Sequence, residues 1–261
     1  MSLQADTPFV LRSDATGVTT LTLNRGERFN PLSEEMLVAL QTEFKAIAAD
    51  ESVRVVVLAA AGKAFCAGHD LKQMQANSSE AYYKSLFQQC SKLMLAIQKL
   101  PQPVIARVHG LATAAGCQLV VMCDLAVASD NASFAVSGVS VGLFCSTPAV
   151  ALSRNVSRKQ AMEMLLTGEF IDAQAAMQRG LINRVVSTEQ LDTCVAELAA
   201  SIVAKPAIAI SMGKQLFYKQ LEMGVEAAYQ LAGQTMACNM LDASAQEGVQ
   251  AFLAKRRPDW S

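Results

Sequence analysis

The stretch Val53–Leu58 contains a single charged residue and is otherwise built from valine and leucine. A strand this apolar is typical of a parallel sheet that is covered on both faces, because neither side of it can face water. Similar apolar strands are expected at 104–108 and 125–128, and helices at 80–99 and 114–122 separate the three. This alternation of strands and helices predicts an α/β fold with parallel strand pairing.

The remaining segments are expected to be arranged around this sheet. Residues 9–24 contain two β-rich runs separated by a Ser-Asp-Ala-Thr-Gly turn and predict a hairpin. From Arg158 onward the pattern is mainly helical, and Lys205-Pro206 is a plausible break. We therefore expect a core over residues 1–204 and a closing helical segment over residues 205–261.

Composition narrows the class of protein. Hydrophobic residues make up 52% of the 261 residues, enough for a sizeable core, and the net charge of −1 argues against a nucleic-acid partner. The seven cysteines form no short-spaced pairs, which argues against a disulfide framework. The chain has only two histidines, which argues against a metal site built from cysteine and histidine. No membrane span or signal peptide is expected. These features predict a reduced, cytoplasmic setting, with the mitochondrial matrix as the alternative if a transit peptide has been removed.

Two turns rich in glycine and alanine carry the strongest functional signal. Ala64–Lys72 follows one predicted strand, and Gly110–Gln118 follows another and opens a helix. Backbone N–H groups in such turns can form an oxyanion hole, since they are fixed by the fold and need no reorganisation during the reaction. The alternative is that the small residues only allow a strand and a helix to pack closely.

The ordered set of motifs resembles one family over roughly residues 9–260. The matching segments are Arg28–Ser33, Lys63–Lys72, Pro103–Leu119, Cys123–Leu125, Leu165–Gly168, Gly180–Asn183 and Ala251–Arg256. Together they are similar to the enoyl-CoA hydratase/isomerase, or crotonase, superfamily. The resemblance implies a crotonase-like spiral of ββα units, an acyl-CoA-binding core, and a C-terminal helical oligomerisation region. It also implies a homotrimer or a hexamer made as a dimer of trimers.

The resemblance also assigns roles to individual residues. It places the carbonyl oxygen of an acyl-CoA thioester between the backbone N–H groups of His69 and Ala115, where an enolate-type oxyanion would be stabilised. Coenzyme A enters as part of the substrate, so no separate cofactor is expected. The residues expected to bind coenzyme A are Arg28, Ala67, His69, Asp70, Leu71 and Lys72, with Phe252 and Lys255 supplied by a neighbouring subunit.

The acid–base residues of the family's hydratases are missing from the expected positions. Those enzymes use two glutamates to hold and activate water, whereas this chain has Gln118 at the first position and Gly138 at the second. An amide does not take a proton near neutral pH, and glycine has no side chain. Residues 137–142 are similar to a segment of dihydroxynaphthoyl-CoA synthases, with Cys145 in place of their aspartate. Gln118, Ser137, Ser140 and Cys145 line a polar pocket or belong to the core.

Two functions follow from these observations. The first is an enzyme of acyl-CoA and fatty acid metabolism, a lyase or isomerase by kinship, whose reaction differs from two-glutamate hydration. The second is a catalytically silent acyl-CoA-binding or scaffold protein that kept the fold and the trimer. If the alignment is right, installing glutamates at Gln118 and Gly138 together is expected to confer crotonyl-CoA hydration.

Overall fold

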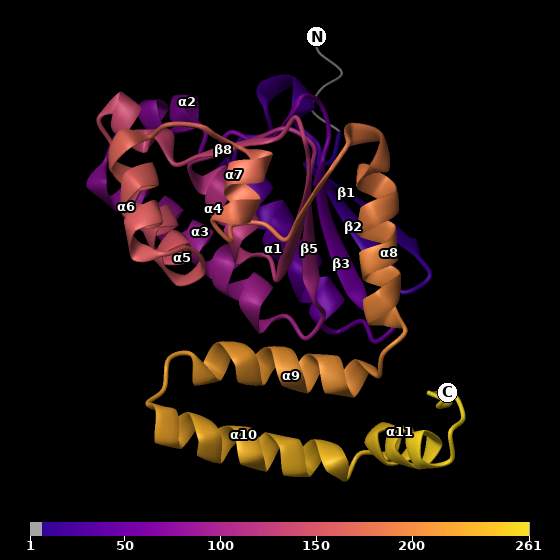
Figure 1. Ribbon diagram of the computed structural model, residues 1–261. Helices are drawn as coiled ribbons and strands as arrows, with labels where there is room; N and C mark the ends of the chain where they lie inside the picture. Colours follow the sequence, from indigo (N-terminus) through magenta and orange to yellow (C-terminus); the bar gives the residue numbers. More distant parts are fainter. Residues whose placement is uncertain (1–6, 261) are drawn as a thin grey trace.

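The computed structural model of the protein describes residues 7–260 and contains a six-stranded sheet at its centre (Figure 1). The strands are β1 (Val10–Ala15), β2 (Val18–Leu23), β3 (Val55–Ala60), β5 (Val104–Val108), β7 (Leu125–Ser129) and β10 (Arg184–Val186), which lie side by side in that order. β1 and β2 form the expected antiparallel hairpin. All other neighbours pair in parallel, which confirms the predicted sheet.

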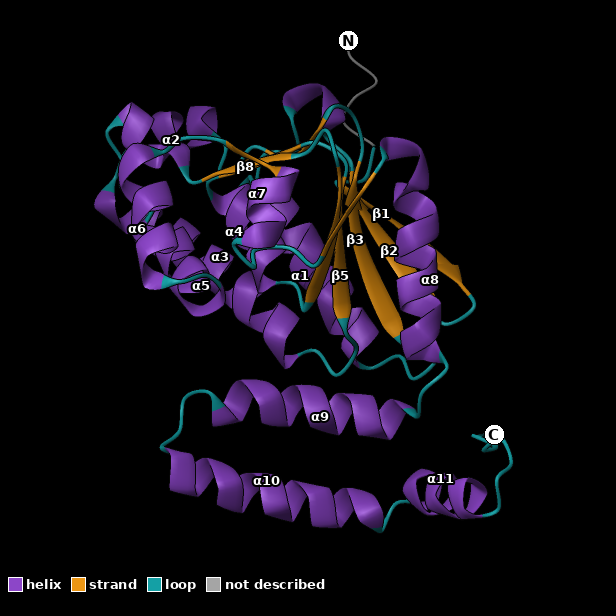
Figure 2. Cartoon of the chain, in the orientation of Figure 1, coloured by secondary structure: helices purple, strands orange, loops and turns teal. Residues whose placement is uncertain are grey.

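The central strand β3 is covered on both faces, as its apolar sequence predicts. All six of its residues are buried. On one face, Val55 and Val57 cluster with Leu191 of α8 (Leu191–Val203), which runs along the sheet in Figure 2. On the other face, Leu58 belongs to the larger hydrophobic core. Burial of both faces explains why this strand lacks the alternation of polar and apolar residues seen in half-exposed strands.

A smaller second sheet gives the fold its spiral character. Its strands, in spatial order, are β4 (Ala64–Cys66), β6 (Leu111–Thr113), β8 (Ser133–Ala135) and β9 (Ile171–Asp172). β4, β6 and β8 pair in parallel, and each follows a strand of the larger sheet. α2 (Leu71–Ala76) follows β4, and α4 (Ala115–Met122) follows β6. This is the ββα order that the resemblance implies, and it brings the turns after β4 and β6 to one edge.

The other helices surround the two sheets and form the C-terminal part. They are α1 (Glu34–Ala48), α3 (Glu80–Lys99), α5 (Ser146–Asn155), α6 (Arg158–Thr167), α7 (Ala173–Gln178), α9 (Ala207–Gln220), α10 (Val225–Met240) and α11 (Ala243–Leu253), with 3-10 turns η1 (Gly26–Arg28), η2 (Ser137–Val141) and η3 (Thr188–Gln190). The expected helices at 80–99 and 114–122 are confirmed to within one residue. Helices α2 and α5 were not expected from the sequence. α2 is only six residues long, and the residue that caps α5 makes no side-chain hydrogen bond.

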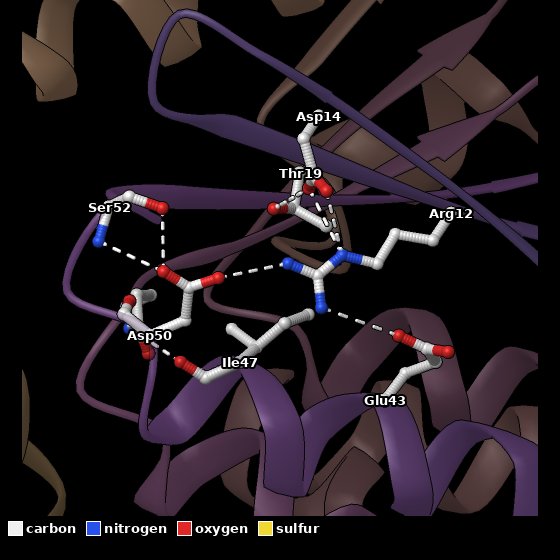
Figure 3. A network of polar contacts seen from close by, with 8 residues as sticks. Arg12, Asp14, Thr19, Glu43, Ile47, Asp50 and Ser52 are labelled. Carbon is white, nitrogen blue, oxygen red and sulfur yellow. Dashed lines mark hydrogen bonds and ion pairs between the residues drawn. The ribbon is translucent and has the colours of Figure 1, made fainter.

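A charged network ties the N-terminal hairpin to α1 and the turn after it (Figure 3). Arg12 of β1 lies 3.0 Å from Asp14, 3.6 Å from Glu43 and 3.1 Å from Asp50. Thr19 of β2 donates a 2.6 Å hydrogen bond to Asp14. One guanidinium thus bridges three carboxylates from three segments, which fixes the edge of the sheet against α1.

The C-terminal helices α9, α10 and α11 lie below the two-sheet body in Figure 1, and a buried lysine connects them to it. Lys214 of α9 donates hydrogen bonds of 2.9 Å to the Ile97 and Gln102 carbonyls and pairs with Asp124 at 2.6 Å. Tyr218 donates to the other Asp124 oxygen at 2.9 Å. Asp124 therefore has a structural role, because it connects α9 to the two-sheet body.

Many large apolar side chains on these helices are exposed. The most exposed are Phe217, Leu221, Val225, Tyr229, Met236, Leu241, Phe252 and Leu253.

Within residues 7–260 no single helix has both the length and the hydropathy of a membrane span. Only the pair Thr188–Val203 and Ala207–Gln220 reaches both together, and it is bent by 102°.

The last residues are held to α11 by an ion pair that should respond to acid. Arg256 contacts Glu247 at 2.5 and 2.8 Å, and Asp259 N–H donates to the same carboxylate at 2.8 Å. The Arg256 hydrogen bonds lower the pKa of Glu247 to about 2. Because the folded pKa is below the ordinary value, this interaction is fully present above about pH 4.5 and is lost as the pH falls through about 2.

We therefore expect acid to release the segment that carries Trp260, the only tryptophan, whose ring packs against Gly248. Trp260 fluorescence should change between about pH 4.5 and 2 while the far-ultraviolet circular dichroism stays constant. Glu247→Gln should show the released signal already at neutral pH. Emission that stays the same over this range in the unmutated protein would contradict the assignment.

Candidate active site

A cavity of about 570 Å³ opens where the turns after β4 and β6 meet. Residues of η1, of the turn into α2, of the beginning of α4 and of the segment from η2 into α5 line it. The residues that line it include Arg28, Ala67, His69, Asp70, Leu71, Lys72, Phe87, Ala114, Ala115, Ser137, Gly138, Val141, Leu143, Phe144 and Cys145.

The two glycine- and alanine-rich turns touch at this cavity. Gly68 has a φ of +91°, a conformation that a side chain would strain. A Cβ atom built on Gly68 would lie 3.0 Å from the Ala114 Cβ and 3.2 Å from the Ala115 nitrogen. Leu32 N–H donates to the Gly68 carbonyl at 2.8 Å, which fixes the turn from the outside. The predicted halves of the oxyanion hole are thus neighbours in space.

The start of α4 is held in an unusual conformation that favours an anion. Ala114 has φ 50° and ψ −121°, a rare backbone geometry for alanine, and its N–H donates to the Ala135 carbonyl at 2.9 Å. Ala115 is the first residue of the helix, so its N–H has no carbonyl four residues earlier in the helix to bind. A Cβ atom on Gly116 would lie 2.1 Å from the Cys66 carbonyl oxygen. Only glycine lets α4 approach β4 this closely.

The His69 side chain is packed inside the protein beside the cavity. Its Nδ1 lies 3.2 Å from the Leu32 carbonyl, and its ring meets Phe87 edge-on at 5.5 Å between centroids. Since a carbonyl oxygen only accepts, Nδ1 carries the proton in this contact, and Nε2 has a lone pair. Nε2 is buried and has no hydrogen-bond partner among the described residues. Burial lowers the pKa of the imidazole, which keeps it neutral.

Most of the predicted coenzyme A residues line this cavity. Arg28, Ala67, Leu71 and Lys72 all do so, as does Asp70. Asp70 also caps α2 by accepting from the Lys72 and Gln73 N–H groups and pairs with Arg28 at 2.7 Å. The half-exposed Arg28 is therefore held at the mouth of the cavity with further N–H groups available.

Two predicted residues lie elsewhere in the same chain. Phe252 is 82% exposed on α11 and faces a separate groove with Trp260, while Lys255 follows the end of that helix. Neither belongs to the lining of the cavity. Their contribution from a neighbouring subunit stays a prediction.

The expected polar pocket forms only in part. Gln118 is buried in α4, one turn below Ala115, and neither it nor Ser140 is among the residues that line the cavity. The Gln118 Oε1 has no hydrogen-bond partner in the described chain. Ser137 does line the cavity, and its hydroxyl lies 2.8 Å from that of Thr113. The role of Gln118 beside a ligand therefore stays a prediction, as does the alternative that it belongs to the core.

Cys145 lines the cavity as an inert thiol. Its Sγ accepts a hydrogen bond from Gly138 N–H at 3.3 Å. Burial raises the pKa of the Cys145 thiol, so the nucleophilic thiolate is disfavoured.

The structure leaves little space for a side chain at Gly138, one of the two positions where the family's hydratases have glutamates. A Cβ atom on Gly138 would lie 2.3 Å from the Leu143 carbonyl oxygen and 2.7 Å from Cys145 Sγ. We now expect Gly138→Glu, alone or with Gln118→Glu, to lower the unfolding free energy by about 1–3 kcal/mol and to give no crotonyl-CoA hydration. Urea unfolding and loss of the enoyl absorbance measure the two effects. Gly138→Ala, which adds only the Cβ, should also destabilise; a Gly138→Glu variant as stable as the unmutated protein would contradict this account.

Sequence reasoning missed the apolar wall of the cavity. Val141, Leu143 and Phe144 are exposed by 66%, 47% and 42%, and all three line it, as does Phe87 of α3. A run of large apolar residues outside regular structure is itself a signal, because exposed apolar surface usually marks a binding site. That signal was present in the residues after Gly138.

With this fold and this pair of turns, the chain belongs to the enoyl-CoA hydratase/isomerase family, whose sequence profile matches residues 13–261. It is 47% identical over 245 residues to the mitochondrial enoyl-CoA hydratase domain-containing protein 3 of Rattus norvegicus, covering 94% of this chain and 82% of the relative. The crystal structure of an enoyl-CoA hydratase from Mycobacterium smegmatis matches with a TM-score of 0.96 and 64% identity, over 97% of this chain and 99% of that one. Human enoyl-CoA hydratase domain-containing protein 3 matches with a TM-score of 0.94 and 45% identity, over 97% and 100%. These likenesses confirm the crotonase fold.

Proposed function

We propose that the cavity binds an acyl-CoA thioester and holds its carbonyl oxygen between the N–H groups of His69 and Ala115. One observation carries the proposal: the turn of Gly68 and the first residue of α4 are adjacent, with a Gly68 Cβ position 3.2 Å from the Ala115 nitrogen. Donors fixed in this way stabilise negative charge that develops on an oxygen. An enolate-type oxyanion is the charge that a thioester would place there.

The charges around the cavity support a coenzyme A moiety at its mouth. Arg28 and Lys72 supply cationic groups there, and the far wall of Val141, Leu143 and Phe144 is apolar. A guanidinium matches the geometry of phosphate oxygens. Phosphates at the cationic side and an acyl group at the apolar side would bring the thioester between them, beside the two turns.

A catalytically silent acyl-CoA-binding protein is the second candidate function. Gly138 has no room for a side chain, and the amide of Gln118 cannot take a proton near neutral pH. Neither residue of the two-glutamate hydratase mechanism can therefore act. The two candidates share the binding step and differ in turnover.

Calorimetric titration with butyryl-CoA, alongside a turnover panel of enoyl-, dienoyl- and malonyl-type CoA thioesters, tests both. We expect micromolar binding that is weakened about tenfold or more by Arg28→Ala, since that variant removes a charge-assisted contact. Lys99→Ala, a surface lysine on α3 outside the cavity lining, is the matched control and should bind normally. Binding without turnover would select the silent protein, and absence of binding would contradict both.

Two further proposals concern assembly and location. The exposed apolar side chains of α9–α11 support a homotrimer or a dimer of trimers built on these helices. Light scattering should then give three or six times the 27.9 kDa chain mass, and a monomer would contradict the proposed assembly.

The relatives named as mitochondrial favour the mitochondrial matrix over the cytoplasm as the location of this chain.

A further inference from the structure

Ser137 lines the cavity and bonds through its hydroxyl group to a buried partner. It is the first residue of η2 and is partly exposed. Its Oγ lies 2.8 Å from the Oγ1 of Thr113, the last residue of β6. Thr113 is only 8% exposed and is not among the residues that line the cavity. Of the two hydroxyl residues, only Ser137 therefore borders the space that a ligand would occupy.

The direction of the hydrogen bond between these two hydroxyl groups follows from burial. Each hydroxyl group has one proton to donate and lone pairs that accept. The Thr113 hydroxyl has Ser137 as its one hydrogen-bond partner in the described chain. Because a buried donor without an acceptor is costly, Thr113 donates and the Ser137 oxygen accepts. The proton of Ser137 itself then has no acceptor among residues 7–260 and is available to a ligand.

The backbone holds this pair of hydroxyl groups beside the turn that opens α4. Thr113 pairs with Ala135 across β6 and β8, and Ala114 N–H donates to the Ala135 carbonyl at 2.9 Å. Ser137 follows Ala135 by two residues, and Ala115 follows Thr113 by two. A ligand atom that meets Ser137 is therefore only a few bonds away from a carbonyl oxygen held at Ala115.

We propose that Ser137 is a specificity-determining residue that donates its free proton to an oxygen on the acyl group of the bound thioester. The inference rests on the proposed function, because it needs the thioester carbonyl in the oxyanion hole. The substrate class is then acyl-CoA thioesters with a hydroxyl or carbonyl oxygen a few bonds from the thioester carbonyl, rather than plain hydrocarbon chains. Ser137 accepts from Thr113 and donates to the ligand, so both hydroxyl groups are satisfied when such a thioester is bound.

The apolar wall of the cavity makes this one donor decisive. Val141, Leu143 and Phe144 have no side-chain acceptor for the Ser137 proton. A hydrocarbon chain that displaces water from Ser137 leaves the donor unpaired, whereas an acyl oxygen takes the place of that water. Because Thr113 fixes the Ser137 oxygen, the donor should also distinguish the two configurations of a carbon that carries a hydroxyl group.

Calorimetric titration with butyryl-CoA and with the two enantiomers of 3-hydroxybutyryl-CoA tests the inference. These thioesters share one carbon chain and differ in a single hydroxyl group. We expect one enantiomer to bind about 3- to 10-fold more tightly than butyryl-CoA, the effect of one hydrogen bond, and this preference to vanish in Ser137→Ala. Ser140→Ala is the matched control. Ser140 is exposed on the same η2 turn and does not line the cavity, so its loss should leave the preference unchanged.

A double variant separates lost recognition from a folding defect, since Ser137→Ala alone leaves Thr113 without an acceptor. Thr113→Val combined with Ser137→Ala removes both hydroxyl groups and leaves no buried donor unpaired, so its urea midpoint should match that of the unmutated protein. It should bind butyryl-CoA normally and show no preference. Equal binding of all three thioesters by the unmutated protein, or a preference that survives in the double variant, overturns the inference. Failure to bind any of them overturns the proposed function instead.

Discussion

Gly116→Ala is expected to reduce the exchange of the butyryl-CoA α-protons with D₂O, which passes through the enolate, about 10²–10³-fold, the loss measured when one oxyanion donor is removed from an enzyme. The added Cβ would lie 2.1 Å from the Cys66 carbonyl oxygen and 2.8 Å from the Cys66 Cβ, so α4 must move away from β4. Ala115 opens that helix, and its N–H would move with it. The exchange rate, normalised to the butyryl-CoA bound, measures the effect.

Gly233→Ala is the matched control for this variant. Gly233 lies inside α10, and a Cβ there would have no atom within 4 Å. Alanine favours the helix, so the control should gain about 0.5–1 kcal/mol in unfolding free energy and exchange at the unmutated rate. Exchange by Gly116→Ala within threefold of the unmutated protein would show that the position of α4 does not set the rate.

Lys214→Met is expected to cause the largest loss of stability, about 3–5 kcal/mol in unfolding free energy by urea titration. The ammonium group is buried, makes two hydrogen bonds to carbonyls and pairs with Asp124 at 2.6 Å. Removing it leaves a partly buried carboxylate without its cation. The methionine side chain fills the space but cannot satisfy Asp124 or the carbonyls of Ile97 and Gln102.

Two companion variants identify the cause of that loss. Lys214→Met combined with Asp124→Asn should recover part of the stability, because the unpaired charge is gone. Tyr218→Phe removes only the 2.9 Å hydrogen bond to Asp124 and should cost about 1.5–3 kcal/mol. A loss below 1 kcal/mol for Lys214→Met would mean that the link between α9 and the core contributes little to folding.

The sequence was sufficient for the parts of the fold that depend on burial. Val53–Leu58 predicted a strand covered on both sides, and β3 is buried throughout. The start of α1 depends on a residue type that favours helix N-termini: the Ser33 hydroxyl accepts from Met36 N–H. The short elements were not predictable in this way. β9 and β10 are two and three residues long, and their strand geometry comes from pairing with β8 and β7 rather than from local preference.

The site was predictable where the backbone carries the chemistry. The turns around Gly68 and Ala115 could be paired by position, because parallel strands end at the same edge of a sheet. Side-chain directions could not be derived from the sequence. Gln118 stands at a position where the family's hydratases have a glutamate, and its Oε1 is buried without a hydrogen-bond partner in the described chain. Gly138 offers no room because the Leu143 carbonyl lies against it, in a tight local turn that the residue types alone do not reveal.

The infrared spectrum of bound butyryl-CoA carrying ¹³C at the thioester carbonyl tests the central claim most directly. Two N–H donors at that oxygen polarise the C=O bond and weaken it. We predict that its stretching band moves to lower wavenumber on binding and returns toward the solution position in Gly116→Ala. A carbonyl band at its solution position in the fully bound complex would contradict the assignment of His69 and Ala115 as the oxyanion hole.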